Sequence, residues 1–96
     1  MSIRVKGYLT LRDIIGEQMF PIGEAGVVTL RDILLKLYQQ KDAQAGKIFY
    51  DPEHDQVGET VNILVNGRNF AILPGQLDMK LEDGDEIAIF PPMAGG

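Results

Sequence analysis

Apolar and polar side chains alternate along the first nine residues of the chain. The apolar row consists of Ile3, Val5 and Leu9, and Gly7 interrupts it. The other side of the same pattern carries Arg4, Lys6 and Tyr8. A period of two predicts a half-buried strand whose apolar row faces the core.

The pattern changes at Leu11. Leu11, Ile14 and Ile15 follow the i, i+3, i+4 spacing of a helix, and Gly16 comes directly after them. This spacing predicts one helical turn that the glycine ends. A second, short strand is predicted over residues 18–22. The proline inside it favours an edge position, because proline cannot donate a hydrogen bond to a neighbouring strand.

The clearest helix signal begins at Thr29. Thr29 and Asp32 are three residues apart, which is the spacing of a capping box. Apolar residues then recur at helical spacing at Leu30, Ile33, Leu34, Leu37 and Tyr38. They form a single apolar stripe, which is typical of a helix that packs on a core. We therefore interpret Thr29 and Asp32 as a helix cap rather than as a functional site.

The middle of the chain predicts a loop and then a hairpin. Residues 51–60 are polar and are expected to form a loop, and residues 61–65 are expected to form a strand. The dipeptide Asn66-Gly67 that follows is a strong signal for a hairpin turn. Residues 68–71 are then predicted to begin the returning strand.

The last predicted strand covers residues 87–90. A turn over residues 81–86 precedes it, and Pro91 and Pro92 end it because proline has no N–H. The first and last strands carry the strongest aliphatic patterns, so both are placed at the centre of the sheet. One long helix must cover one face of this sheet. The predicted fold class is α+β with a β-grasp architecture, a small mixed sheet covered by one main helix.

Length and composition narrow the function. With 96 residues and no linker or repeat, the sequence predicts a single domain over residues 1–96, with a flexible C-terminal tail over residues 91–96. It shows no apolar run of membrane-spanning length and no signal peptide, so a cytoplasmic location is expected. The net charge of −5 argues against a nucleic-acid surface. The chain has no cysteine, so a partner must supply the sulfur for any sulfur chemistry.

The candidate chemistry lies at the C-terminus. Pro91 and Pro92 favour a stiff, extended exit from the sheet. Gly95 and Gly96 have no side chains, so they can enter a tunnel too narrow for other residues. ATP can convert the Gly96 carboxylate to an acyl-adenylate, and a sulfur nucleophile can then displace AMP to give a thiocarboxylate. A partner must provide the ATP site, because the chain has no Walker-type phosphate-binding loop.

Residues 84–96, GDEIAIFPPMAGG, resemble the C-terminal signature of the small subunit of molybdopterin synthase, a MoaD/ThiS-like, ubiquitin-like sulfur carrier. Stretches at 11–16, 65–67 and 81–85 are similar to the same family at corresponding places. The resemblance implies a ubiquitin-like β-grasp fold and a sulfur-carrier function. In the family, the terminal glycine is adenylated and thiocarboxylated, and it then donates sulfur to cyclic pyranopterin monophosphate in molybdenum cofactor biosynthesis.

The resemblance also implies roles and partners. Gly96 would bear the sulfur, and Gly95 would thread the partner's active site. The partner-binding surface or stiff neck would comprise Phe90, Pro91, Pro92, Met93 and Ala94. The implied partners are the large subunit of molybdopterin synthase in a heterotetramer, an E1-like adenylyltransferase and a sulfur-donor enzyme. No cofactor or metal is expected on this chain itself, and ATP is used by the activating partner.

Other functions remain open for this chain. Two of them also begin with activation of the Gly96 carboxylate, and one does not need it. The chain could carry sulfur to another acceptor, such as thiamin thiazole, cysteine or tRNA. It could also be a ubiquitin-like modifier joined through Gly96 to lysines of other proteins. The plainest alternative is a binding module whose two final glycines are an inert, frayed end.

Apolar residues directly before the tail give a further hypothesis. Ile89, Phe90 and Met93 could leave an exposed patch, and such patches often mark protein contacts. The opposing interpretation places Phe90 in the core.

A weaker candidate lies in the polar stretch 51–60. Four side chains there can bind hard cations, namely Asp51, Glu53, His54 and Asp55. All four fall within five residues of a polar segment. A solvated loop is therefore the preferred interpretation, and no metal site is predicted.

Overall fold

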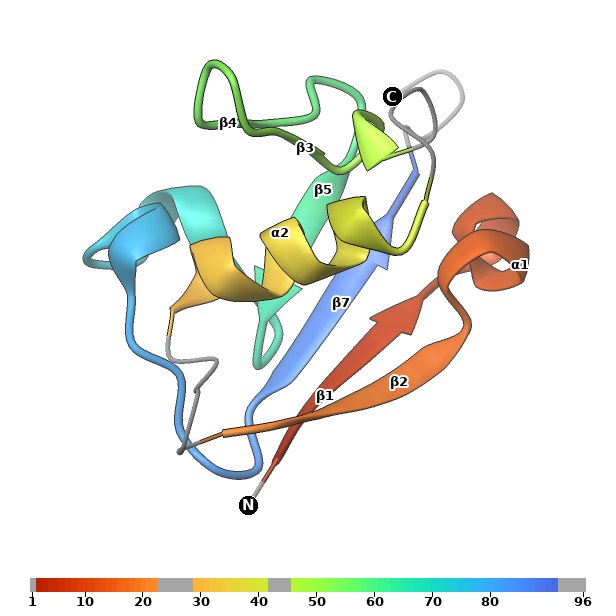
Figure 1. Ribbon diagram of the computed structural model, residues 1–96. Helices are drawn as coiled ribbons and strands as arrows, with labels where there is room; N and C mark the ends of the chain where they lie inside the picture. Colours follow the sequence, from red (N-terminus) through yellow and green to blue (C-terminus); the bar gives the residue numbers. More distant parts are fainter. Residues whose placement is uncertain (1, 23–28, 42–45, 92–96) are drawn as a thin grey trace.

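One helix lies across one face of a mixed sheet (Figure 1). The computed structural model describes residues 2–22, 29–41 and 46–91. The strands are β1 (Ser2–Gly7), β2 (Glu17–Pro21), β3 (Tyr50–Asp51), β4 (Gln56–Val57), β5 (Asn62–Val65), β6 (Arg68–Asn69) and β7 (Glu86–Phe90). The helices are α1 (Arg12–Ile15) and α2 (Leu30–Gln39), with 3-10 turns η1 (Leu9–Leu11), η2 (Phe70–Ile72) and η3 (Gln76–Asp78). Within these described segments, no helix has the length and apolarity that a membrane crossing requires.

The main sheet has five strands in the order β2-β1-β7-β5-β6. β1 and β7 pair in parallel, with Val5 opposite Ile87, and β7 pairs antiparallel with β5, with Ile63 opposite Ile89. The first and last strands lie side by side, a pairing that the sequence pattern alone does not fix. The predicted edge position of β2 and the predicted central placement of β1 and β7 are confirmed. A mixed sheet of this order under one main helix confirms the α+β, β-grasp prediction.

The core forms between α2 and one face of the sheet. From the helix it receives Leu30, Ile33, Leu34 and Leu37. From the three central strands it receives Ile3, Val5, Ile63, Val65, Ile87 and Ile89. The helix begins at the predicted capping box: the Thr29 N–H donates to Asp32 Oδ2 at 3.0 Å, and the Asp32 N–H donates to Thr29 Oγ1 at 3.2 Å. The apolar stripe and the cap are thus confirmed.

The prediction that Leu9 faces the core was wrong. Leu9 is 54% exposed, with φ +55°, because β1 ends at Gly7 and the chain turns into η1. Leu11 reaches the core instead. The turn brings the backbone so close to Gly7 that a Cβ there would lie 2.5 Å from the Leu11 carbonyl oxygen and 2.9 Å from Ile15 Cβ. The interruption of the apolar row at Gly7 therefore marks a close backbone approach.

The prediction of a plain loop over residues 51–60 was also wrong in part. β3 and β4 form a separate two-stranded sheet, in which Tyr50 pairs with Val57. Its base is apolar, since Phe49 is fully buried and Tyr50 is 3% exposed. A pattern search misses this hairpin because each strand is only two residues long. The hairpin that the sequence predicts, β5–β6, is present, and both Asn66 and Gly67 have the positive φ that its tight turn requires.

Candidate functional site at the end of β7

The candidate site is the end of β7, from which the tail continues. β7 is held on both sides here: the Tyr8 N–H donates to the Ile89 carbonyl at 3.0 Å, and Asn62 of β5 pairs with Phe90. Pro91, the last described residue, is buried. The chain therefore leaves the sheet from a position that its two neighbouring strands fix.

Most of the predicted site residues lie outside the part of the chain that the structure describes. They are Pro92, Met93, Ala94, Gly95 and Gly96. Of the predicted partner-binding residues, Phe90 is half-buried and Pro91 is buried. The roles assigned to all seven remain predictions.

An aromatic pair marks the point where β7 ends. The rings of Tyr8 and Phe90 stack with their centroids 4.5 Å apart and their planes at 7°. The Lys6 ammonium lies 5.2 Å from the centroid of the Tyr8 ring, within the range of a cation–π contact. The parallel register places Lys6 opposite Ala88, so the next outward-facing pair along the two strands is Tyr8 and Phe90. A stacked pair contributes about 0.5–1.5 kcal/mol beyond the area it buries.

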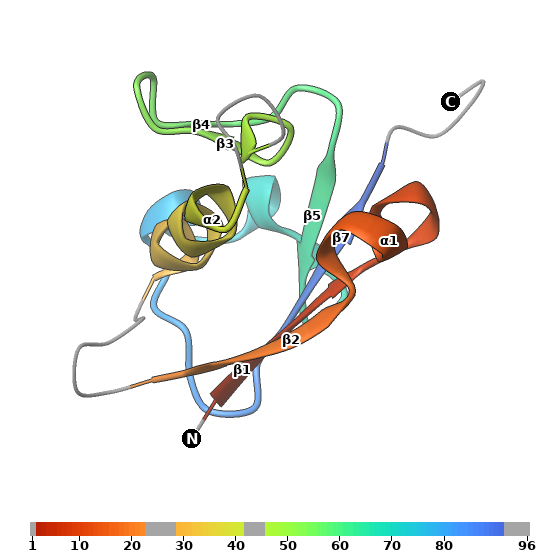
Figure 2. The ribbon, with the colours of Figure 1, turned by 45° about the vertical axis from the view of Figure 1, so that its right-hand side comes forward.

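The position of Phe90 in this pair tests the hypothesis that apolar residues form an exposed patch directly before the tail. Figure 2 shows α2 along one face of the sheet. Phe90 is half-buried and follows the fully buried Ile89 on β7, so it points to the other face, and the interpretation that places it in the core is wrong. Ile89 is fully buried and cannot contribute to an exposed patch, because neighbouring residues of a strand point to opposite faces. Met93 lies outside the described residues. Sequence reasoning missed Tyr8 as the partner of Phe90, since only the parallel pairing of β1 and β7 brings the two rings together.

The open face of the sheet divides into an apolar end and a charged end. Leu64 and Ala88, both half-buried, pair across β5 and β7 beside the aromatic pair. At the other end, Arg4 lies between two carboxylates, 3.4 Å from Glu17 and 4.0 Å from Glu86. The apolar end is the one next to the tail, so a protein that takes up the tail meets the aromatic pair first.

A charged network lies on the helix side of the molecule. The Arg31 guanidinium binds Asp55 through two hydrogen bonds, Nε to Oδ1 at 2.7 Å and Nη2 to Oδ2 at 2.9 Å. Its Nη1 also donates to Asp78 of η3. The Tyr50 hydroxyl donates to Asp55 Oδ1 at 2.5 Å. The sequence places Arg31 on the outer face of α2 but does not reveal these partners, which lie 24 and 47 residues away.

The network shifts the pKa values of its members. Hydrogen bonds from Arg31 and then from Tyr50 lower the pKa of Asp55 below its usual 3.8. Burial, followed by the hydrogen bond to Asp55, raises the pKa of Tyr50 from 10.0 to about 12. The arrangement thus stabilises an ionised Asp55 beside a neutral Tyr50.

We expect Tyr50 to give the stability of the protein a dependence on alkaline pH. Because folding raises its pKa, its contribution is fully present below pH 10 and is lost as the pH rises towards about 12. At neutral pH, Tyr50→Phe should lower the free energy of unfolding by about 1.5 kcal/mol, since it removes a hydrogen bond to a charged acceptor. Urea unfolding of both proteins between neutral pH and pH 12 measures this difference.

Tyr38→Phe is the matched control for this prediction, because Tyr38 lies on α2 outside the network. It removes a tyrosine hydroxyl outside the network, so at neutral pH it should lower the free energy of unfolding by less than Tyr50→Phe does. A Tyr50→Phe difference that stays constant up to pH 12 would contradict the assigned hydrogen bond.

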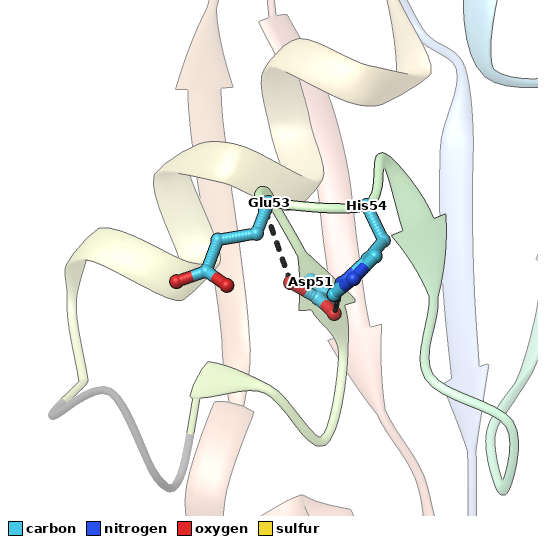
Figure 3. Close-up of side chains that lie close together, drawn as sticks. All are labelled: Asp51, Glu53 and His54. Carbon is cyan, nitrogen blue, oxygen red and sulfur yellow. Dashed lines mark hydrogen bonds and ion pairs between the residues drawn. The ribbon is translucent and has the colours of Figure 1, made fainter.

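The candidate cation ligands of the polar stretch are only partly brought together. Ligand atoms of Asp51, Glu53 and His54 lie within 4.8 Å of one another. His54 Nδ1 is 2.7 Å from Asp51 Oδ2, and the Glu53 N–H donates to Asp51 Oδ1 at 3.0 Å. In Figure 3, His54 faces Asp51, whereas the Glu53 carboxylate stands apart from this pair. The hydrogen bond to His54 is also the main reason that the pKa of Asp51 is lowered.

The fourth candidate ligand, Asp55, turns to Arg31 instead of joining the other three. The cluster is mostly solvent-exposed, and its hydrogen bonds close a tight turn. This arrangement agrees with a solvated turn, which is the interpretation that the sequence favours.

A β-grasp domain whose central last strand leads towards a Gly-Gly ending defines the ubiquitin-like class of proteins. Comparison with known proteins specifies the family. Residues 8–96 match the ThiS family. The chain is 33% identical over 96 residues to small archaeal modifier protein 3 of Haloferax volcanii, and the match covers 100% of both chains. The chain therefore belongs to the ThiS family, which confirms the resemblance to ubiquitin-like sulfur carriers.

Solved structures agree with this assignment. The small archaeal modifier protein 1 of Methanosarcina acetivorans has a TM-score of 0.72 and 31% identity, over 99% of this chain and 96% of that one. A putative molybdopterin converting factor subunit 1 from Pyrococcus furiosus has a TM-score of 0.65 and 26% identity, over 97% of this chain and 99% of that one. Proteins named for two different functions thus share this fold.

Proposed function

We propose that the carboxylate of Gly96 is the reactive group of this protein, and that it carries sulfur as a thiocarboxylate. In this proposal the chain acts as the small subunit of molybdopterin synthase and donates sulfur to cyclic pyranopterin monophosphate. The observation that carries the proposal is the position of β7. In a chain of the ThiS family, this central strand ends at a fixed point and leads directly into a sequence that closes with two glycines.

The chemistry requires no catalytic side chain on this chain. The carboxylate attacks the α-phosphate of ATP, so an acyl-adenylate forms and pyrophosphate leaves. A sulfur nucleophile at the oxidation level of hydrosulfide then attacks the carbonyl carbon, and the bond to AMP breaks. The product is a thiocarboxylate, whose sulfur is a nucleophile at neutral pH. The E1-like enzyme supplies the ATP site, and the sulfur donor supplies the nucleophile.

The geometry at the end of β7 supports delivery of the tail to a partner. The five residues that follow Pro91 can span at most about 18 Å when fully extended. An enzyme that acts on Gly96 must therefore approach the end of β7. There it meets the stacked rings of Tyr8 and Phe90, which offer a large apolar contact at low cost in conformational entropy.

A second candidate function is protein modification through Gly96. The relative that is 33% identical over both full chains is named a modifier, and this observation favours the second function. The Pyrococcus furiosus protein, named as a molybdopterin converting factor, favours the first. Both functions use the same adenylate and differ in the acceptor. In protein modification a lysine amine attacks the activated acyl carbon, whereas in sulfur donation the thiocarboxylate sulfur attacks an electrophilic carbon of the pterin.

An intact-mass measurement tests the proposal. The chain is produced with an unmodified C-terminus together with the E1-like and sulfur-donor enzymes of its own host. We expect a species heavier by the difference between one sulfur and one oxygen, with the change mapped to Gly96 by peptide fragmentation. If the chain stays unmodified while a known carrier is converted in parallel, the sulfur-carrier proposal fails.

The acceptor is decided by two further measurements. Formation of molybdopterin from cyclic pyranopterin monophosphate, with the thiocarboxylated chain and the large synthase subunit, would support the first function. Isopeptide remnants of Gly96 on lysines of other host proteins would support the second.

A further inference from the structure

We propose that Arg31 is a positioning residue for the activation of the tail. It holds the hairpin over residues 50–57 at the tail end of the molecule, so that the activating enzyme meets this hairpin as a preformed surface. The inference rests on the proposed function, because it assumes that an enzyme takes up the tail.

The hairpin lies at the end of the molecule where β7 ends. The Gly58 N–H donates to the Phe49 carbonyl at 2.9 Å and closes the base of the hairpin. The chain then enters β5, whose first residue, Asn62, is opposite Phe90. Figures 1 and 2 both show the hairpin and the end of β7 at the same end of the molecule.

The length of the tail brings an enzyme close to this hairpin. Because the residues after Pro91 reach about 18 Å at most, an enzyme with its active site in a narrow channel must close around the end of β7. The enzyme then contacts the molecule on both sides of β7, next to β1 and next to β5. One side carries the aromatic pair, and the other carries the connection from the hairpin into β5. The base of the hairpin, which leads into β5, therefore adjoins the area that the enzyme covers.

The hairpin has few interactions of its own. Its ladder consists of two residue pairs, and a two-stranded hairpin of this size is marginally stable at best in water. Asp55 at its turn has φ +51°, a conformation that costs energy for a residue other than glycine. Phe49 and Tyr50 anchor its base, but its turn lies beyond them in solvent. Its own turn hydrogen bonds, from the Glu53 N–H and the His54 ring to Asp51, are exposed to solvent, so we expect contacts from outside the hairpin to add to its order.

Arg31 provides those contacts. Its planar guanidinium matches the Asp55 carboxylate with two hydrogen bonds, a geometry that lysine cannot reproduce. The same side chain reaches Asp78, so it ties the hairpin turn to both α2 and η3. The Tyr50 hydroxyl fixes Asp55 from the base of the hairpin. Arg31 is itself half-buried, with 31% of its side chain exposed, so its position is restricted.

The test compares three full-length variants with the wild-type protein. Arg31→Gln removes the ion pairs with both Asp55 and Asp78. Asp78→Asn removes only the ion pair between Arg31 and η3. Lys36→Gln changes an exposed charge on the same helix and serves as the control. Amide hydrogen exchange reports the order of residues 50–57, and ATP–pyrophosphate exchange by the host's E1-like enzyme reports adenylation. For Arg31→Gln we expect faster exchange in the hairpin and a KM for the chain about fivefold higher, with kcat unchanged. Asp78→Asn and Lys36→Gln should keep KM within about twofold of the wild type.

Arg31→Lys keeps the positive charge and serves as a control in case Arg31→Gln fails to fold. It should give an intermediate KM with an unchanged melting temperature. The inference is overturned if Arg31→Gln loosens the hairpin while KM stays at the wild-type value, or if hairpin exchange does not change. Failure of the wild type itself to be adenylated would instead count against the proposed function, and the exchange data would still test the role of Arg31 in the hairpin.

Discussion

Deletion of Gly95 and Gly96 is expected to abolish activation of the chain completely, without lowering its stability. Loss of activation follows because the deletion leaves Ala94 as the last residue. Its carboxylate ends two residues short, roughly 7 Å of extended chain, and stands next to a Cβ. Stability should be unaffected because the buried hydrophobic residues that form the core lie between Ile3 and Ile89 in the sequence, and the deletion removes none of them. Intact mass with the activating enzymes and a thermal melt measure the two properties.

Ala94→Ser is the matched control, since it changes the tail but keeps both glycines and their reach. This variant should be activated like the wild type. Gly96→Ala is expected to lie between the two, because it keeps the length but adds a Cβ beside the reacting carboxylate. If the chain without its two final glycines still acquires sulfur or still joins other proteins, the reactive group is not Gly96, and the proposed function is wrong.

Gly7→Ala is expected to lower the free energy of unfolding by about 2–3 kcal/mol. The added Cβ would lie 2.5 Å from the Leu11 carbonyl oxygen and 2.9 Å from Ile15 Cβ. The Leu11 carbonyl belongs to the backbone, so it cannot move aside as a flexible side chain can. The backbone at Leu11, the last residue of η1, must shift. Because the Leu11 N–H donates to the Tyr8 carbonyl, the shift should reach Tyr8, whose N–H holds the end of β7. Urea unfolding measures the loss, and the near-ultraviolet circular dichroism of Tyr8 should change with it.

Gly67→Ala separates this steric effect from the removal of a glycine as such. No atom lies within 4 Å of a Cβ at position 67, and only the φ of +85° resists the substitution. The expected cost is about 1 kcal/mol. Equal losses for the two variants would show that the contact between β1 and η1 is looser than described.

The sequence predicts most of the fold because its signals are local. The capping box at Thr29, the apolar stripe of α2 and the Asn66-Gly67 turn each depend on residues a few positions apart. Even the central placement of β1 and β7 follows from their apolar composition. The prediction failed at Leu9 because the alternation continues two residues beyond Gly7, where the strand ends, and only the close packing around Gly7 shows this end.

The side-chain contacts around the candidate site join residues that are far apart in the sequence. A single sequence does not reveal such contacts. Tyr8 and Phe90 are far apart in the chain and meet because β1 and β7 run in parallel. Arg31 reads as an exposed helix residue, yet it joins two segments that lie 24 and 47 residues away. The tail, which we propose to be reactive, is the opposite case. Its chemistry was inferred from the last residues alone, and the fold adds only the fixed point from which they start.

The parallel pairing of β1 with β7 has a consequence for how the protein folds. The sheet lacks its middle strand until residue 90 has been synthesised, so β1 must wait, with one of its edges unpaired, for almost the whole chain. Contacts between segments this far apart in the chain form slowly, so we expect the pairing of β1 with β7 to be a late step of folding. The strand that completes the sheet is also the strand that the tail follows in the sequence. If the tail is activated as we propose, an enzyme that binds at the end of β7 would take only chains in which the sheet is complete.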